Sequence, residues 1–232
     1  VGIKNIVIAQ NKIDLVSNEE AFENYKQIKE FVKGTIAENA PIIPISAQHN
    51  VNIDMVIEAI EKIIVTPNRD SSKDPLFFIA RSFDINRPGS EIVSLHGGVL
   101  GGSLKDGKLK VNQEIEIKPG LKVESHGKIT YKSLRTKILD IKTGGLSVKE
   151  LLPGGSAGIE TDLDPSLVKS DSLSGNVVGL PEKLPPVWNE LNLKPHLLKR
   201  VVGSKEELEV EPIKKMEQLL LNVNSTATVG LV

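Results

Sequence analysis

The first seventy residues alternate between short apolar runs and longer segments whose apolar positions recur at helical spacing. Residues 3–9 and 40–45 are continuous apolar runs typical of buried strands in parallel sheets. Residues 17–37 and 53–64 carry apolar side chains three or four positions apart, which predicts amphipathic helices. The order of these segments predicts a βαβα unit.

Local residue chemistry supports both predicted helices. Ser17 and Glu20 have the spacing of a capping box, in which each side chain accepts a hydrogen bond from the other residue's backbone N–H. Asn50 or Asn52 is expected to cap the second helix.

Beyond a linker over residues 66–75, helical spacing gives way to short β runs separated by glycine and proline. Asp106-Gly107 and Pro119-Gly120 are predicted to form turns between them. Several short strands at this spacing predict a closed antiparallel barrel, with strands at 76–83, 92–95, 109–111, 114–117, 129–131, 137–141 and 156–160.

Four glycines at 97, 98, 101 and 102 bracket Val99-Leu100. Glycine within a strand usually marks a bulge, a barrel corner or a close backbone approach. A phosphate-binding loop is the alternative, but no helix start follows, as such a loop requires. We therefore favour the structural interpretation.

A second break lies at residues 180–186, where proline recurs. Residues 191–202 are predicted to begin a third unit, and residues 216–223 and 227–232 to form a hairpin that the chain does not complete. Trp188 is predicted to anchor this junction by packing. We expect three domains, over residues 1–72, 73–182 and 183–232.

Composition is that of an ordinary globular protein: 39% hydrophobic and 25% charged residues, with a net charge of −1 over 232 residues. The chain has no cysteine, which excludes disulfides and thiolate metal sites. The four histidines show no metal-ligand spacing, so no metal site is predicted. Residues 103–142 carry ten Lys/Arg against five Asp/Glu, which we interpret as a solvated basic face.

No apolar stretch approaches the roughly 20 residues of a membrane helix, and the sequence shows no signal-peptide pattern. We expect a cytoplasmic protein without a membrane partner. Because the chain starts at Val1 without methionine and ends at Val232 inside an apolar pattern, we expect an internal fragment.

The segment Asn11-Lys12-Ile13-Asp14 directly follows the first apolar run. Asp14 could accept hydrogen bonds from the ring N–H and the exocyclic amine of guanine together, whereas adenine offers neither donor. Asn11 would brace the loop, and Lys12 would lay its methylene stem along the base or ribose. Ligands of open α/β sheets bind at the carboxyl ends of the strands, where this segment lies.

Ser46-Ala47-Gln48 follows the second apolar run, so the two loops are expected at neighbouring strand ends. Small residues here let the chain approach a base closely. Taken singly, these residues could be turn formers and solvated charges. Taken together, Asn11, Lys12, Asp14, Ser46, Ala47 and Gln48 predict a guanine-binding site.

With these two loops, the chain resembles the translational GTPases, and more closely the gamma subunits of archaeal and eukaryotic translation initiation factor 2. The resemblance covers all 232 residues. Further segments that carry it are Arg81-Ser82-Phe83-Asp84-Ile85-Asn86-Arg87-Pro88-Gly89, Gly97-Gly98-Val99-Leu100-Gly101-Gly102, Glu114 to Gly120, and Leu184-Pro185-Pro186-Val187-Trp188.

The resemblance implies an α/β part that is the C-terminal half of a P-loop GTPase-like domain. An elongation-factor-type β-barrel and the start of a second β-barrel would follow it. It also implies binding of GTP or GDP with Mg²⁺, delivery of methionyl initiator tRNA to the small ribosomal subunit, and assembly with alpha and beta subunits.

The sequence departs from the family in one respect. No G-x-x-x-x-G-K-[ST] loop and no D-x-x-G switch precede Asn11, so the residues that would hold phosphates and Mg²⁺ are absent. We therefore assign no catalytic residue and expect this sequence alone to be inactive. Alternatives are a selenocysteine-specific or general elongation factor, or a non-enzymatic β-barrel adaptor.

Overall fold

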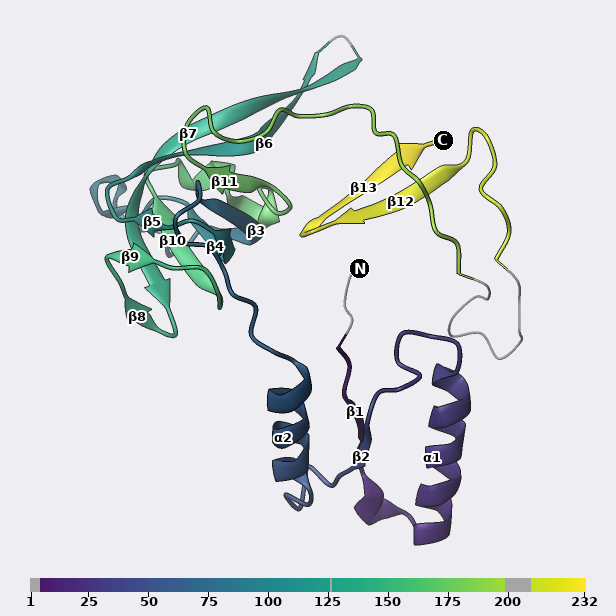
Figure 1. Cartoon of the computed structure of the whole chain (residues 1–232). Coiled ribbons are helices and arrows are strands. Elements are labelled where there is room, and N and C mark those ends of the chain that lie inside the picture. The colour runs from purple at the N-terminus through teal and green to yellow at the C-terminus, as the bar shows by residue number, and fades with distance from the viewer. Residues whose placement is uncertain (1–4, 126, 199–209) are drawn as a thin grey trace. The chain divides into compact units, whose positions relative to one another are not determined.

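The computed structural model describes residues 5–125, 127–198 and 210–232. The chain divides into two compact units, residues 1–68 and residues 69–232. Figure 1 shows the first as an α/β unit and the second as a β-rich unit. The division falls four residues before the predicted boundary at residue 72. The three-way division into 1–72, 73–182 and 183–232 stays a prediction.

The α/β unit has the predicted element order. Strands β1 (Ile8–Gln10) and β2 (Ile42–Pro44) pair in parallel, with Ile8 opposite Ile42. Helix α1 (Asn18–Val32) connects them, and helix α2 (Ile53–Ile63) follows β2. Both strands are shorter than the apolar runs that predicted them.

The two helix starts differ from each other. At α1 the predicted capping box is present, because Glu20 N donates to Ser17 Oγ over 3.2 Å and Ser17 N to Glu20 Oε2 over 2.8 Å. At α2, Asn52 occupies the cap position in a left-handed conformation, but its side chain makes no capping bond. Its amide instead donates to the Pro44 carbonyl over 2.8 Å, so Asn52 has the predicted cap position without a side-chain capping bond.

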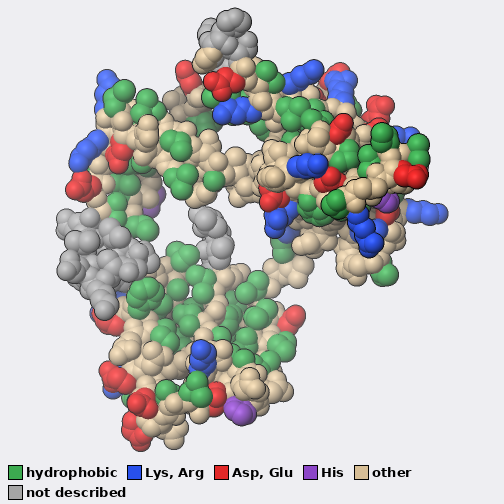
Figure 2. Space-filling model, turned by 180° about the vertical axis from the view of Figure 1, so that it is seen from behind, with side chains coloured by type: hydrophobic (Ala, Val, Ile, Leu, Met, Phe, Trp, Pro, Cys, Tyr) green, Lys and Arg blue, Asp and Glu red, His purple; other side chains and the backbone are tan. Residues whose placement is uncertain are grey.

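Much of the apolar surface of both helices faces solvent. In α1, which is described in full, Val32 is the one buried residue. In α2, also described in full, no residue is buried. Figure 2 shows hydrophobic side chains gathered over part of this unit's surface. A two-stranded sheet offers too little area to cover two amphipathic helices. The exposed hydrophobic side chains in and just after these helices include Phe22, Ile36, Met55, Ile57, Ile60 and Ile64.

The second unit is built around a closed six-stranded barrel (Figure 1). Neighbouring strands follow the order β10-β4-β3-β11-β6-β7, and β7 pairs back onto β10. The core is aliphatic apart from Phe77. The barrel strands are β3 (Leu76–Phe83), β4 (Val99–Asp106), β6 (Glu114–Ser125), β7 (Lys128–Thr143), β10 (Ala157–Thr161) and β11 (Val177–Gly179). Short strands β5 (Leu109–Lys110), β8 (Leu146–Ser147) and β9 (Glu150–Leu151) flank it.

Two predicted details of the barrel are wrong. Residues 92–95 form no strand, because Ile92–Ser94 is a short 3-10 helix with Ile92 and Val93 almost fully exposed. Pro119-Gly120 is no turn between strands, because both residues lie inside the long strand β6 at a register shift. The predicted runs 129–131 and 137–141 are parts of one strand, β7.

The glycines in β4 and just before it allow close backbone approaches, as predicted. A Cβ on Gly97 would lie 1.7 Å from the carbonyl oxygen of Thr161, and one on Gly102 would lie 1.9 Å from that of Phe78. Neither distance leaves room for a side chain. These glycines therefore serve strand packing in the barrel.

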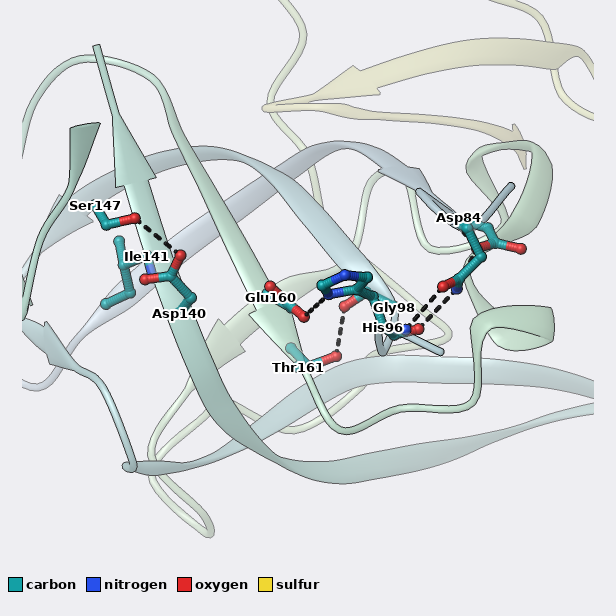
Figure 3. A network of polar contacts seen from close by, with 9 residues as sticks. Asp84, His96, Gly98, Asp140, Ile141, Ser147, Glu160 and Thr161 are labelled. Carbon is teal, nitrogen blue, oxygen red and sulfur yellow. Dashed lines mark hydrogen bonds and ion pairs between the residues drawn. The ribbon is translucent and has the colours of Figure 1, made fainter. Parts of the chain in front are cut away.

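The loop between β3 and β4 is closed at its base by polar contacts, shown in Figure 3. The Asn86 amide donates to the His96 carbonyl over 2.8 Å and accepts from His96 N over 2.7 Å. The His96 imidazole Nδ1 lies 2.9 Å from Glu160 Oε1 on β10. The contacts fix both ends of the loop to the barrel wall.

After two short 3-10 helices, Pro165–Leu167 and Lys169–Asp171, the chain leaves the barrel through β11. The predicted hairpin is confirmed as β12 (Gln218–Val223) paired with β13 (Thr226–Leu231). Described residues 191–198 contain no strand, and 199–202 lie outside the described residues. Trp188 is 70% exposed, so its predicted packing role is wrong. No described helix is long and apolar enough to cross a membrane.

Candidate functional site

The two motif-bearing loops lie at the same edge of the α/β unit, because β1 and β2 are parallel and each loop leaves a carboxyl end. Backbone bonds join them: Ile45 N donates to the Gln10 carbonyl over 2.8 Å, and Ile13 N donates to the Ile45 carbonyl over 3.3 Å. Gln10 is buried, and its amide donates to the Ala21 carbonyl of α1 over 2.7 Å. The base of the site is therefore fixed by the sheet and by α1.

Asn11 bridges the loops through its side-chain oxygen. Asn11 Oδ1 accepts from the backbone N–H of Lys12 over 2.8 Å and from that of Ala47 over 3.1 Å. Lys12 adopts the left-handed conformation, with φ of 68°. Asn11 thus braces the loop as predicted, and its partner is the backbone of Ala47.

Asp14 points its carboxylate at the second loop. The Ser46 hydroxyl beside it is the main cause of a pKa below the usual carboxyl range. Partial burial opposes this shift, whereas Asp14's own backbone amide and the charges of His49 and Lys12 support it. At neutral pH the group is ionised, so it can act only as a hydrogen-bond acceptor.

Ser46 is held rigidly while Asp14 stays accessible. Ser46 is 1% exposed and forms an antiparallel bridge with Val51, with N–H to carbonyl distances of 3.3 and 3.0 Å. Its hydroxyl oxygen also accepts from His49 N over 3.3 Å. The Asp14 side chain is 21% exposed. A fixed donor therefore orients a carboxylate that a ligand can still reach.

The structure brings Asn11, Asp14, Ser46 and Ala47 together. Lys12 and Gln48 are exposed beside them, where Lys12 contributes its charge to Asp14. Sequence reasoning placed His49 in the second loop but gave it no role, and in the structure its Nε2 lies 3.7 Å from Asp14 Oδ2. No group of three or more potential metal ligands occurs among the described residues.

The arrangement suits a ligand with two adjacent N–H donors. An ionised carboxylate with two free lone-pair directions pairs bidentately with such an edge, as it does with a guanidinium group. The small side chain at Ala47 and the exposed stem of Lys12 leave the neighbouring surface open to a flat ring.

Comparisons with known proteins agree on one family. A family model described as "Initiation factor eIF2 gamma, C terminal" matches residues 189–232. The chain is 60% identical to translation initiation factor 2 subunit gamma of Pyrococcus furiosus over 232 residues, which is all of this chain and 56% of that protein. The subunit of Methanothermobacter thermautotrophicus is 54% identical, again over all of this chain and 57% of that protein. The chain thus spans about half the length of the curated relatives it matches.

Solved structures support the fold. Translation elongation factor SelB from Methanococcus maripaludis, in complex with the GTP analogue GPPNHP, matches with a TM-score of 0.59 and 20% identity, over 77% of this chain and 35% of that one. A bacterial selenocysteine-specific elongation factor matches with a TM-score of 0.59 and 21% identity, over 78% of this chain and 27% of that one. At this identity the likeness concerns the fold.

Proposed function

We propose that this chain belongs to the gamma-subunit family of translation initiation factor 2, and that its two loops form the guanine-reading part of a GTP- and GDP-binding site. The observation that carries the proposal is the Asp14 carboxylate, ionised and oriented by the buried Ser46 hydroxyl at the carboxyl edge of a parallel strand pair. Ligands of open α/β sheets bind at this edge.

Each residue has a role in the proposed site. Asp14 accepts from the ring N–H and the exocyclic amine of guanine. Asn11 holds the two loops in register through Ala47, and Ser46 orients Asp14. Lys12 and Gln48 border the base from exposed positions, with the Lys12 stem packing along it. Adenine would leave a desolvated carboxylate unpaired, and such sites reject the wrong ligand strongly.

We further propose that the full-length protein hydrolyses GTP and delivers methionyl initiator tRNA to the small ribosomal subunit in the cytoplasm, together with alpha and beta subunits. Phosphate and Mg²⁺ contacts are the main source of catalysis in such enzymes, and the motifs that make them are not in these 232 residues. We therefore assign only recognition of the base to this sequence, with no hydrolysis by itself.

Two alternatives are less well supported. An elongation factor of the selenocysteine-specific type shares the barrel fold, but the identity of this chain to the solved examples is 20–21%, against 60% to an initiation factor subunit. A non-enzymatic barrel adaptor would give the ionised, oriented Asp14 no ligand. Nucleotide binding separates this alternative from the proposal.

The test is a change of base preference in the full-length protein. Asp14→Asn replaces a carboxylate acceptor by an amide, whose N–H₂ pairs with the extra carbonyl of xanthine. We expect the variant to lose guanine nucleotide affinity by about tenfold or more, the scale of an unmatched buried polar pair, and to gain affinity for xanthosine triphosphate. Competition against a fluorescent GDP measures both.

Asp74→Asn is the matched control, because it makes the same chemical change at an exposed linker position. It should leave both affinities unchanged. If Asp14→Asn prefers GTP over xanthosine triphosphate as strongly as the unaltered protein does, Asp14 does not bind the base.

A further inference from the structure

His49 lies beside the carboxylate that is proposed to bind guanine. Its Nε2 is 3.7 Å from Asp14 Oδ2, which is longer than a hydrogen bond and within the range of an ion pair. Its backbone N–H donates to Ser46 Oγ over 3.3 Å, so the residue is fixed to the same hydroxyl that orients Asp14. The side chain is 63% exposed and reaches solvent.

The imidazole and the base compete for one acceptor. Guanine needs both oxygens of the carboxylate for its two donors, and the Ser46 hydroxyl already lies beside that carboxylate. A positively charged imidazole attracts Asp14 Oδ2, whereas a neutral imidazole does so only weakly. The charge on His49 therefore determines how much of the carboxylate is free for a base.

Histidine side chains ordinarily gain their proton as the pH falls through about 6.5, within the physiological range. Among the described residues, Asp14 is the acidic group facing the imidazole, and Lys12 is the other charged side chain that acts on Asp14. Of these residue types, histidine is the one that ordinarily changes its charge between pH 5 and pH 8.

We propose that His49 is a positioning residue for the base-reading carboxylate, and that its protonation weakens guanine nucleotide binding as the pH falls. The inference rests on the proposed guanine site and adds a form of regulation to it. Neutral His49 leaves Asp14 to the base, and charged His49 draws the carboxylate away from it.

The test measures the affinity of the full-length protein for a fluorescent GDP at pH 7.5 and pH 5.5. Between these values the unaltered protein should lose about 1.5- to 5-fold more affinity than His49→Ala, which is the range that exposed ion pairs contribute. Titration of the GDP phosphates affects both proteins equally and cancels in the comparison. His49→Lys carries a permanent charge and should bind weakly at both pH values.

His196→Ala is the matched control, because His196 is exposed and lies outside the two loops. It should retain the pH response of the unaltered protein. An identical pH response in the unaltered protein and His49→Ala overturns the inference, as does tighter binding of the unaltered protein in acid. If the protein fails to prefer GDP over ADP and Asp14→Asn changes nothing, the guanine site itself is refuted.

Discussion

The hydroxyl of Ser46, at the end of one strand, lies beside the carboxylate of Asp14, which follows the neighbouring strand. Ser46 is buried and bridged to Val51, so it is the fixed partner, and Asp14 takes its orientation from it. Preorganisation of this kind reduces the entropy lost when a ligand binds. The relationship makes the two loops one site.

Ser46→Ala should therefore weaken guanine nucleotide binding by about two- to tenfold, the contribution of one hydrogen bond. It should also raise the pKa of Asp14 towards its usual value, because the main cause of the lowered pKa is removed. Calorimetric titration with GDP and carboxyl NMR shifts of Asp14 measure the two effects.

Ser72→Ala is the comparison variant, since Ser72 likewise lowers the pKa of Asp70 in the exposed linker. It should raise the pKa of Asp70 and leave GDP binding unchanged. Unchanged binding in Ser46→Ala would mean that Asp14 is oriented by other contacts.

Gly102→Ala should destabilise the barrel by at least about 1–3 kcal/mol, the usual cost of overpacking. The added Cβ would lie 1.9 Å from the Phe78 carbonyl oxygen and 2.9 Å from the Phe77 ring. Backbone atoms cannot move aside as the end of a flexible side chain can. Chemical denaturation followed by circular dichroism gives the free energy of unfolding.

Gly158→Ala on the neighbouring strand is the matched control, because the nearest atom to its added Cβ is 4.0 Å away. It should be close to neutral. Equal destabilisation by both substitutions would show that the clash with the Phe78 carbonyl does not decide the outcome.

Glu116 should make the barrel less stable in acid. It is 4% exposed, and burial alone would raise its pKa. Hydrogen bonds from Glu182 N and the Ser133 hydroxyl, with the charges of Lys118 and Arg135, outweigh burial and lower the pKa overall. A lowered folded-state pKa contributes stability above the unfolded-state pKa of about 4.3 and loses it as the pH falls through the folded-state pKa.

Glu116→Gln keeps the side-chain volume and removes the titration. We expect a smaller decline in unfolding free energy between pH 5 and pH 3 than in the unaltered protein, measured by urea denaturation across that range. Glu114→Gln, at the start of the same strand, should leave the decline as it is. If the unfolding free energy of Glu116→Gln declines as much as that of the unaltered protein, other carboxyl groups cause the acid sensitivity.

Much of the site could be predicted because its signals are local in sequence. The capping box at Ser17 and Glu20 depends on residues three apart, and the structure confirms it. The meeting of Asp14 with Ser46 followed from parallel strand order. His49, part of the second loop, was given no role because its position beside Asp14 depends on how that loop turns back at Val51, which residue spacing does not encode.

The barrel was predicted less completely, for physical reasons that differ by segment. Strand β4 was not predicted, because Gly101 and Gly102 serve close backbone packing and carry no strand propensity. Pro119-Gly120 has the chemistry of a turn but sits at a register shift within β6. Ile92 and Val93 have high strand propensity, yet they lie in an exposed loop without a pairing partner strand.

The amide of Asn86 pairs with the peptide of His96 as another strand would, by one donated and one accepted bond. A single side chain thus ties together the two ends of the loop between β3 and β4. The residues between the two, 87–95, are all exposed, so substitutions among them should cost the barrel core little stability. The loop between β3 and β4 could therefore be redesigned without changing the two barrel strands that it connects.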